Sequence, residues 1–223
     1  MLKAADLELL ERGIAQLKLK LSTVQIQQIV AYANLLLKWN KKYSLSAISD
    51  PQQIIIHHLL DGLAALPYFP ERGTILDVGS GMGVPGVLLA ITLPGASLVL
   101  LDSNGKKCAF LRQVQIELNL TNLQIVAHRI ETYRPESAIT CFTSRAFADL
   151  NLFLQLTKDL VNTESYYLAL KGPQGLVELT ELAEENRWQA QAIQLSVPFL
   201  DAQRYLIKIS KQNQIKNFAK ASF

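Results

Sequence analysis

The most informative stretch of the chain reads TILDVGSGMGVPG over residues 74–86, where four glycines follow a strand-like apolar run. Such a run, bounded by glycines, is typical of a short strand buried on both faces. Glycine directly after a strand lets the backbone adopt a positive φ and approach a ligand closely. Because ligands of doubly wound sheets bind beyond the carboxyl ends of the strands, this turn predicts a binding site.

Two classes of cofactor use such a turn, and the register of the glycines distinguishes them. A dinucleotide takes G-x-G-x-x-G, which residues 81–86 match literally. The strand ends at residues 77–78, however, so the first turn glycine is Gly79, and Val84 stands where the third dinucleotide glycine belongs. The carboxylate of Asp77 would repel a pyrophosphate but suits the cationic amine of S-adenosylmethionine. Asp102, after the next predicted strand, suits the ribose of either cofactor, so a methyl donor is favoured and a dinucleotide stays open.

Strands and helices alternate on either side of this turn. The pattern predicts a mostly parallel sheet covered by helices on both faces. The last two strands are joined by a short loop and must therefore be antiparallel neighbours. The predicted strands are 74–78, 97–101, 123–127, 140–143, 165–170, 192–197 and 205–209, and the predicted helices between them are 87–93, 106–118, 150–161 and 176–186.

The first seventy residues read as helices only. Ser22 and Gln25 have the spacing of a capping box, and Asp50-Pro51 is a helix-start signal. The basic and aromatic segment 38–43 is explained by a cation-rich last helical turn, with a nucleic-acid contact as the alternative. We therefore predict a helical cap over residues 1–70, a sheet domain over 71–210 and a basic, frayed tail over 211–223.

Composition excludes several classes of protein. Among 223 residues, 49% are hydrophobic and 18% are charged, which argues against a disordered chain. Two cysteines rule out a disulfide scaffold and a four-thiolate zinc site, and we predict no metal. Residues 78–101 carry no charge, but glycines and Pro94-Gly95 divide the run into pieces too short to span a membrane. With no secretory signal, these features predict a soluble cytoplasmic protein, and a net charge of +3 is compatible with a nucleic-acid partner.

Eight short motifs together resemble one known family, and the resemblance runs from about Tyr32 to Ile209. That family is the bacterial small-subunit ribosomal RNA methyltransferase G family (RsmG), also called glucose-inhibited division protein B. The glycine turn alone indicates only a class I methyltransferase, whereas the WN, HxxD and SRA elements are much more specific. The motifs are KWNK at 38–41, HLLD at 58–61, DVGSG at 77–81, PG at 85–86, LDS at 101–103, FL at 110–111, SRA at 144–146 and LKG at 170–172.

The resemblance implies a Rossmann-like class I methyltransferase sheet with an N-terminal helical cap. It also implies transfer of a methyl group from S-adenosylmethionine to N7 of one guanine in 16S ribosomal RNA, as free RNA or in the small ribosomal subunit. Carried over by position, the implied catalytic residues are Arg145, Asn40 and His58. The implied RNA-binding residues are Arg129, Lys171 and Arg204, and the implied cofactor-binding residues are Gly79, Ser80, Gly81, Gly83, Val84, Asp102, Ser103, Ile130, Glu131 and Arg145.

Guanine N7 carries a free lone pair at neutral pH, so this reaction needs no general base and depends on in-line positioning. That requirement fits a chain with three histidines and no evident Ser-His-Asp arrangement. His58 and Asp61 are interpreted first as a hydrogen-bonded structural pair, and Arg204 has the alternative of an exposed loop residue. The chain is predicted to be a monomer. The alternative functions are an NAD(P)-dependent oxidoreductase and a non-catalytic RNA-binding module on the same fold.

Overall fold

A computed structural model of the chain describes residues 1–183 and 188–211 and contains one seven-stranded sheet of order β3-β2-β1-β4-β5-β7-β6. The first five strands are parallel, while β7 runs antiparallel to both of its neighbours. This confirms the predicted mostly parallel sheet with an antiparallel last strand. The strands are β1 (Gly73–Val78), β2 (Ala96–Leu101), β3 (Leu123–Val126), β4 (Cys141–Arg145), β5 (Tyr166–Lys171), β6 (Trp188–Leu195) and β7 (Arg204–Lys211).

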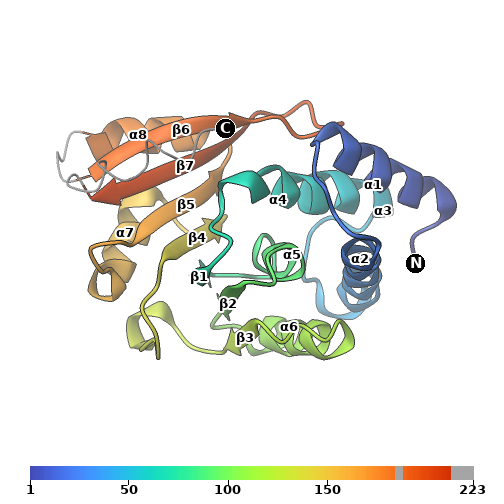
Figure 1. Ribbon diagram of the computed structural model, residues 1–223, viewed down its shortest axis with the longest axis horizontal. Helices are drawn as coiled ribbons and strands as arrows, with labels where there is room; N and C mark the ends of the chain where they lie inside the picture. Colours follow the sequence, from blue (N-terminus) through green and yellow to red (C-terminus); the bar gives the residue numbers. More distant parts are fainter. Residues whose placement is uncertain (184–187, 212–223) are drawn as a thin grey trace.

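The helices divide into two groups (Figure 1). Those of the N-terminal region gather at one end of the molecule, and α7 and α8 lie at the other. The predicted helix 150–161 ends earlier, in a 3₁₀ turn at Lys158–Leu160, and residues 184–186 of the last predicted helix lie outside the described residues. The helices are α1 (Ala4–Gln16), α2 (Thr23–Tyr43), α3 (Pro51–Ile54), a π-helix (Ile55–Leu60), α4 (Asp61–Ala64), α5 (Gly86–Thr92), α6 (Gly105–Glu117), α7 (Leu150–Thr157) and α8 (Gln174–Ala183).

Alternation along the strands separates two hydrophobic cores. Ile75 in β1 packs into the core formed with α2, α5 and α6, whereas its neighbour Leu76 packs into the core formed with α7. Successive side chains of a strand point to opposite faces, which is why the two neighbours belong to different cores. The helices of residues 1–70 share the first core, so they are packed directly against the seven-stranded sheet and its helices.

Local capping explains how the N-terminal helices begin and where they attach. Ser22 accepts a hydrogen bond from the Gln25 backbone N–H, and the Gln25 side chain accepts one from the Ser22 N–H, as the capping box predicts. The Gln25 amide also donates to the Ile91 carbonyl at 3.1 Å, which ties α2 to the end of α5. Asp50 caps α3 through the Gln53 N–H, and this confirms the predicted helix start.

Three basic residues differ slightly from their expected positions. Arg145 and Lys171 are the last residues of β4 and β5, whereas the predicted strands end before them, and Arg204 begins β7 instead of lying in a loop. The reason is pairing between neighbouring strands, since Arg145 pairs with Leu170 and Lys171 with Tyr205. Among the helices of the described residues, none is both long and apolar enough to cross a membrane.

Candidate functional site

The glycine turn after β1 is fastened to the end of β2. The backbone N–H groups of Gly79 and Ser80 donate to the Leu101 carbonyl at 2.8 and 3.1 Å. The Gly81 N–H donates to Oδ2 of Asp102 at 2.9 Å. Gly79, Gly81 and Gly83 all have positive φ angles, which glycine adopts at no steric cost. The predicted turn is therefore confirmed, and its conformation brings the two strand-end motifs DVGSG and LDS into direct contact.

Asp77 lies beneath this turn and is fully buried. Its Oδ2 accepts a hydrogen bond from the Gly86 N–H at 3.1 Å, and its Oδ1 has no hydrogen-bond partner among the described residues. Burial, only partly offset by the Gly86 N–H, raises the pKa of Asp77 to about 7. That this carboxylate faces a cofactor amine stays a prediction of the sequence. Its role in the structure is to hold the start of α5.

Replacement of Asp77 by asparagine should change how stability depends on pH. Because folding raises this pKa from 3.8 to about 7, the contribution of Asp77 to stability is fully present below about pH 4 and is lost as the pH rises through 7. Asp77→Asn removes the titration, so the variant should gain up to about 4 kcal/mol relative to wild type between pH 4 and pH 7. Urea unfolding of the ligand-free proteins at several pH values measures the difference. A difference that does not vary with pH would contradict this assignment.

Two cavities lie at the carboxyl edge of the sheet and share Gly79, Lys107 and Ala146. The Arg145 cavity, of about 570 Å³, lies between the glycine turn and the helical cap. The Asp102 cavity, of about 430 Å³, lies between the end of β2 and the start of α7. Together they form a divided site on both sides of the glycine turn, as expected for the edge of such a sheet.

Most of the predicted site residues line one of these cavities. Asn40 and Gly83 line neither of them, and Gly83 is buried within the turn itself. Two groups share a cavity: His58, Gly79, Ser80, Gly81, Val84, Arg145, Lys171 and Arg204 line the Arg145 cavity, and Gly79, Asp102, Ser103, Arg129, Ile130 and Glu131 line the Asp102 cavity.

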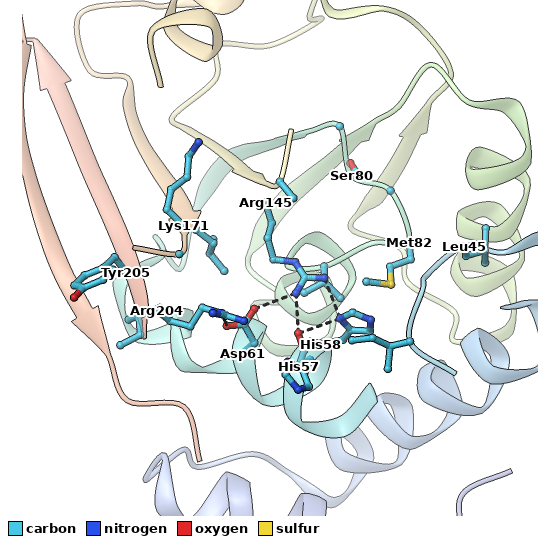
Figure 2. Close-up of a pocket in the computed structure, with 18 of the residues that line it drawn as sticks. Leu45, His57, His58, Asp61, Ser80, Met82, Arg145, Lys171, Arg204 and Tyr205 are labelled. Atoms are coloured by element: carbon cyan, nitrogen blue, oxygen red, sulfur yellow. Dashed lines mark hydrogen bonds and ion pairs between the residues drawn. The ribbon is translucent and has the colours of Figure 1, made fainter. Parts of the chain in front are cut away.

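Arg145 connects three residues of the helical cap at its cavity (Figure 2). Its Nη1 donates to the His57 carbonyl at 2.9 Å and to Oδ2 of Asp61 at 3.0 Å. Its Nη2 lies 3.3 Å from Nδ1 of His58. Burial and the neighbouring Arg145 guanidinium lower the pKa of His58 to about 4, so the imidazole is neutral at pH 7. His58 and Asp61 therefore meet through Arg145, which revises the interpretation of them as a directly bonded pair.

Asn40 supports one wall of the Arg145 cavity without lining the cavity itself. Its amide donates to the Ile48 carbonyl at 2.9 Å and accepts from the Ser46 N–H at 2.8 Å. The Ser46 hydroxyl lies 2.8 Å from Nε2 of His58. Both sides of the Asn40 amide are thus used to fold the loop after α2, and that loop carries the cavity residues Leu45 and Ile48.

Comparison with known proteins places the chain in a family. The family model described as "GidB: rRNA small subunit methyltransferase G" matches residues 25–207, which is most of the chain. The chain belongs to this methyltransferase G family. The matched range agrees closely with the extent of the resemblance, about Tyr32 to Ile209, and includes the glycine turn, Asp102 and the Arg145 cluster.

Curated relatives with the same family name match this chain over nearly their whole length. A protein of Stutzerimonas stutzeri named "Ribosomal RNA small subunit methyltransferase G" is 47% identical over 201 residues, covering 90% of this chain and 93% of that protein. Its namesake in Chromobacterium violaceum is 41% identical and covers 91% and 97% of the two chains.

Solved structures show the fold at much lower sequence identity. A putative S-adenosylmethionine-dependent methyltransferase of Methanococcus maripaludis has a TM-score of 0.57 at 17% identity, covering 82% of this chain and 93% of that one. A structure titled "DhpI-SAH complex" has a TM-score of 0.55 at 12% identity, covering 84% and 97%. The predicted class I methyltransferase fold is thereby confirmed for this member of the methyltransferase G family.

Among the residues at or near the site that lie outside the predicted set, three make contacts that shape it. Lys107 lines both cavities and lies 3.9 Å from the Asp102 carboxylate. Tyr32, fully buried in α2, donates its hydroxyl to the Met82 carbonyl at 2.8 Å and so anchors the glycine turn to the helical cap. Asp61 accepts from two arginines. The only signal for these residues in the sequence is the HLLD motif, which contains Asp61 but gives no partner for it.

Proposed function

We propose that this chain transfers a methyl group from S-adenosylmethionine to N7 of one guanine in 16S ribosomal RNA, by in-line displacement without a general base. The observation that carries the proposal is membership of the methyltransferase G family over residues 25–207. The curated relatives are named ribosomal RNA small subunit methyltransferases, which supports ribosomal RNA as the substrate. Neither an oxidoreductase nor a non-catalytic RNA-binding module is favoured by these comparisons.

The residues around the glycine turn fit S-adenosylmethionine chemically. Asp102 is buried, and its two oxygens accept from the N–H groups of Gly81 and Asn104. Each carboxylate oxygen has a second lone pair, so Asp102 retains capacity for two ribose hydroxyls. Ile130 and Glu131 line the same cavity and would border the adenine. The bound cofactor supplies a methyl group activated by a cationic sulfur.

The other half of the divided site would receive the guanine and its phosphates. Arg145 and Arg204 both line the Arg145 cavity, and guanidinium groups pair well with phosphate and with guanine O6. N7 must stay free to react, so Arg145 would bind O6 or phosphate and not N7. The pKa of His58, lowered to about 4, makes it a weak base, and its ring is held against Arg145, so it would orient that guanidinium instead of removing a proton.

The proposal is tested by methyl transfer to small-subunit RNA that lacks the modification. We expect label from methyl-labelled S-adenosylmethionine to enter 16S RNA and to be recovered as 7-methylguanosine after digestion. Isothermal titration is expected to give micromolar binding of S-adenosylmethionine, weakened at least about 10-fold in Asp102→Ala, and no binding of NAD or NADP.

Separate outcomes would contradict separate parts of this proposal. Label recovered in another nucleoside would overturn the N7 assignment but keep the methyltransferase. Binding of a dinucleotide in place of S-adenosylmethionine would overturn the cofactor. Assays with both free RNA and assembled small subunits are needed, because a substrate formed only in the particle would otherwise give a false negative.

A further inference from the structure

Two arginines reach one buried carboxylate from strands that are not neighbours. Arg145 ends β4 and Arg204 begins β7, and β5 lies between these strands. Because β7 is antiparallel, its first residue lies at the same edge of the sheet as the last residue of β4. Strands are about 4.8 Å apart, so the two backbones are about 10 Å apart at this edge. Only long side chains that lean toward one another can meet there.

The strand register decides which basic side chains converge. Arg145 pairs with Leu170, and Leu170 pairs with Leu206, so these three share one face of the sheet. Arg204 precedes Leu206 by two residues and lies on that face too. Lys171 pairs with Tyr205 on the opposite face. Its ammonium group contacts Glu178 at 2.7 Å and the Ala148 carbonyl at 2.6 Å, and Figure 2 shows it pointing away from the arginine pair.

Asp61 divides its two oxygens between the two arginines. Oδ2 accepts from Nη1 of Arg145 at 3.0 Å, and Oδ1 accepts from Nε of Arg204 at 3.1 Å (Figure 2). Asp61 is only 3% exposed, and it lies at the first residue of α4, where the preceding π-helix ends. A buried charge held by two charge-assisted hydrogen bonds fixes the geometry of its partners more firmly than an exposed ion pair does.

We propose that Asp61 is a positioning residue that holds Arg145 and Arg204 side by side as a preformed receptor for a hydrogen-bond-accepting oxygen of the RNA substrate. This inference rests on the proposed function. Arg145 uses Nη1 for Asp61 and the His57 carbonyl, and Arg204 uses Nε for Asp61 and Nη1 for the Gln203 carbonyl. A guanidinium has five N–H donors, so each arginine keeps donors for a phosphodiester or for guanine O6. Asp61 orders the two arginine side chains, and its negative charge lowers the net positive charge of the cavity by one.

The Asp61→Asn variant separates the ordering of the two arginine side chains from the charge of the cavity. It keeps the side-chain shape but removes the carboxylate, so the two arginines are less ordered while the cavity gains positive charge. We expect kcat to fall about 10-fold, while the Kd for RNA stays the same or becomes smaller. The dependence of RNA affinity on salt should become steeper, by up to about one unit of log–log slope. A Kd that rises in proportion to the loss of kcat, or an unchanged kcat, would overturn the proposal.

An activity-free measurement keeps this test separate from the proposed function. In ¹⁵N-detected spectra of the RNA-free protein, the Arg204 Nε–H group should give a distinct, slowly exchanging signal, because it donates to a buried carboxylate. This signal should be lost in Asp61→Asn. If wild type itself transfers no methyl group to RNA, the proposed function fails, whereas an Arg204 signal insensitive to Asp61→Asn overturns the positioning role.

Two further variants guard against trivial explanations. Asp159→Asn removes an exposed carboxylate from the 3₁₀ turn after α7, and it should leave kcat, RNA affinity and the Arg204 signal unchanged. If Asp61→Asn does not fold, Arg204→Lys keeps the charge but lacks the Nε donor. It should lower kcat about 10-fold with RNA affinity within about twofold of wild type. An Arg204→Lys protein with wild-type kcat would overturn the proposal.

Discussion

Arg145→Ala is expected to lower kcat/KM for methyl transfer to 16S RNA at least about 100-fold. The substitution removes a cavity-lining guanidinium that would orient the guanine or its phosphate. It also removes the guanidinium from the His57 carbonyl and leaves Arg204 as the one remaining side-chain partner of the Asp61 carboxylate among the described residues. The loss should therefore exceed that of Asp61→Asn, in which both guanidiniums remain. Single-turnover transfer of labelled methyl groups is the appropriate measurement.

Arg112→Ala is the matched control, because Arg112 is an exposed arginine on α6 that lines neither cavity. It should retain wild-type transfer. Titration with S-adenosylmethionine then separates binding from catalysis, and Arg145→Ala should bind the cofactor within about fivefold of wild type. If Arg145→Ala retained full RNA methylation and cofactor affinity, the central role of this arginine would have to be abandoned.

Gly79→Ala is expected to weaken S-adenosylmethionine binding about 100-fold and to lower stability by about 2–3 kcal/mol. Gly79 has a φ of +68°, and a Cβ placed there would collide with the ring of Phe147. The side chain must therefore take up a strained backbone conformation and also displace a residue that lines the Asp102 cavity. Calorimetric titration and thermal unfolding measure the two effects independently.

Two other glycines provide graded controls for that experiment. At Gly81, φ is +60° but the nearest atom to an added Cβ is 3.8 Å away, so Gly81→Ala should cost only the backbone strain, about 1–2 kcal/mol. At Gly105, the first residue of α6, no atom lies within 4 Å and φ is not positive, so Gly105→Ala should be neutral or slightly stabilising. Equal effects at all three positions would show that the Phe147 contact is irrelevant.

Local rules predicted the strands, the capping box at Ser22 and the helix start at Asp50, because each depends on residues a few positions apart. The glycine turn and its link to Asp102 were also accessible, since successive parallel strands end at the same edge of the sheet. Family resemblance then supplied a set of site residues, most of which line one of the two cavities. The predicted ends of the strands agreed less exactly with the structure. Pairing with a neighbouring strand decides whether Arg145 or Lys171 still belongs to its strand.

The role of Asp61 could not be predicted from the sequence, because its two partners lie 84 and 143 residues further along the chain. The spacing of His58 and Asp61 suggested a local pair, whereas Arg145 lies between them in space. The π-helix contributes to this difference, since it changes which side chains and carbonyl groups share a face. Asn40 differs from its prediction in another way. It was expected at the site because it belongs to a motif, but its side chain holds the loop after α2 and does not line the cavity.

The position of β7 between β5 and β6 has a consequence for synthesis on the ribosome. A nascent chain that has emerged through β5 can already form the glycine turn, the Asp102 cavity and Arg145. Until β7 arrives, however, β5 is an edge strand whose residues from Tyr166 to Leu170 are all ones that the finished protein buries. Open apolar edges invite pairing with other chains. Translation that stops after α8 should therefore yield a species that aggregates, and completion of β7 both closes this edge and delivers Arg204 to the site.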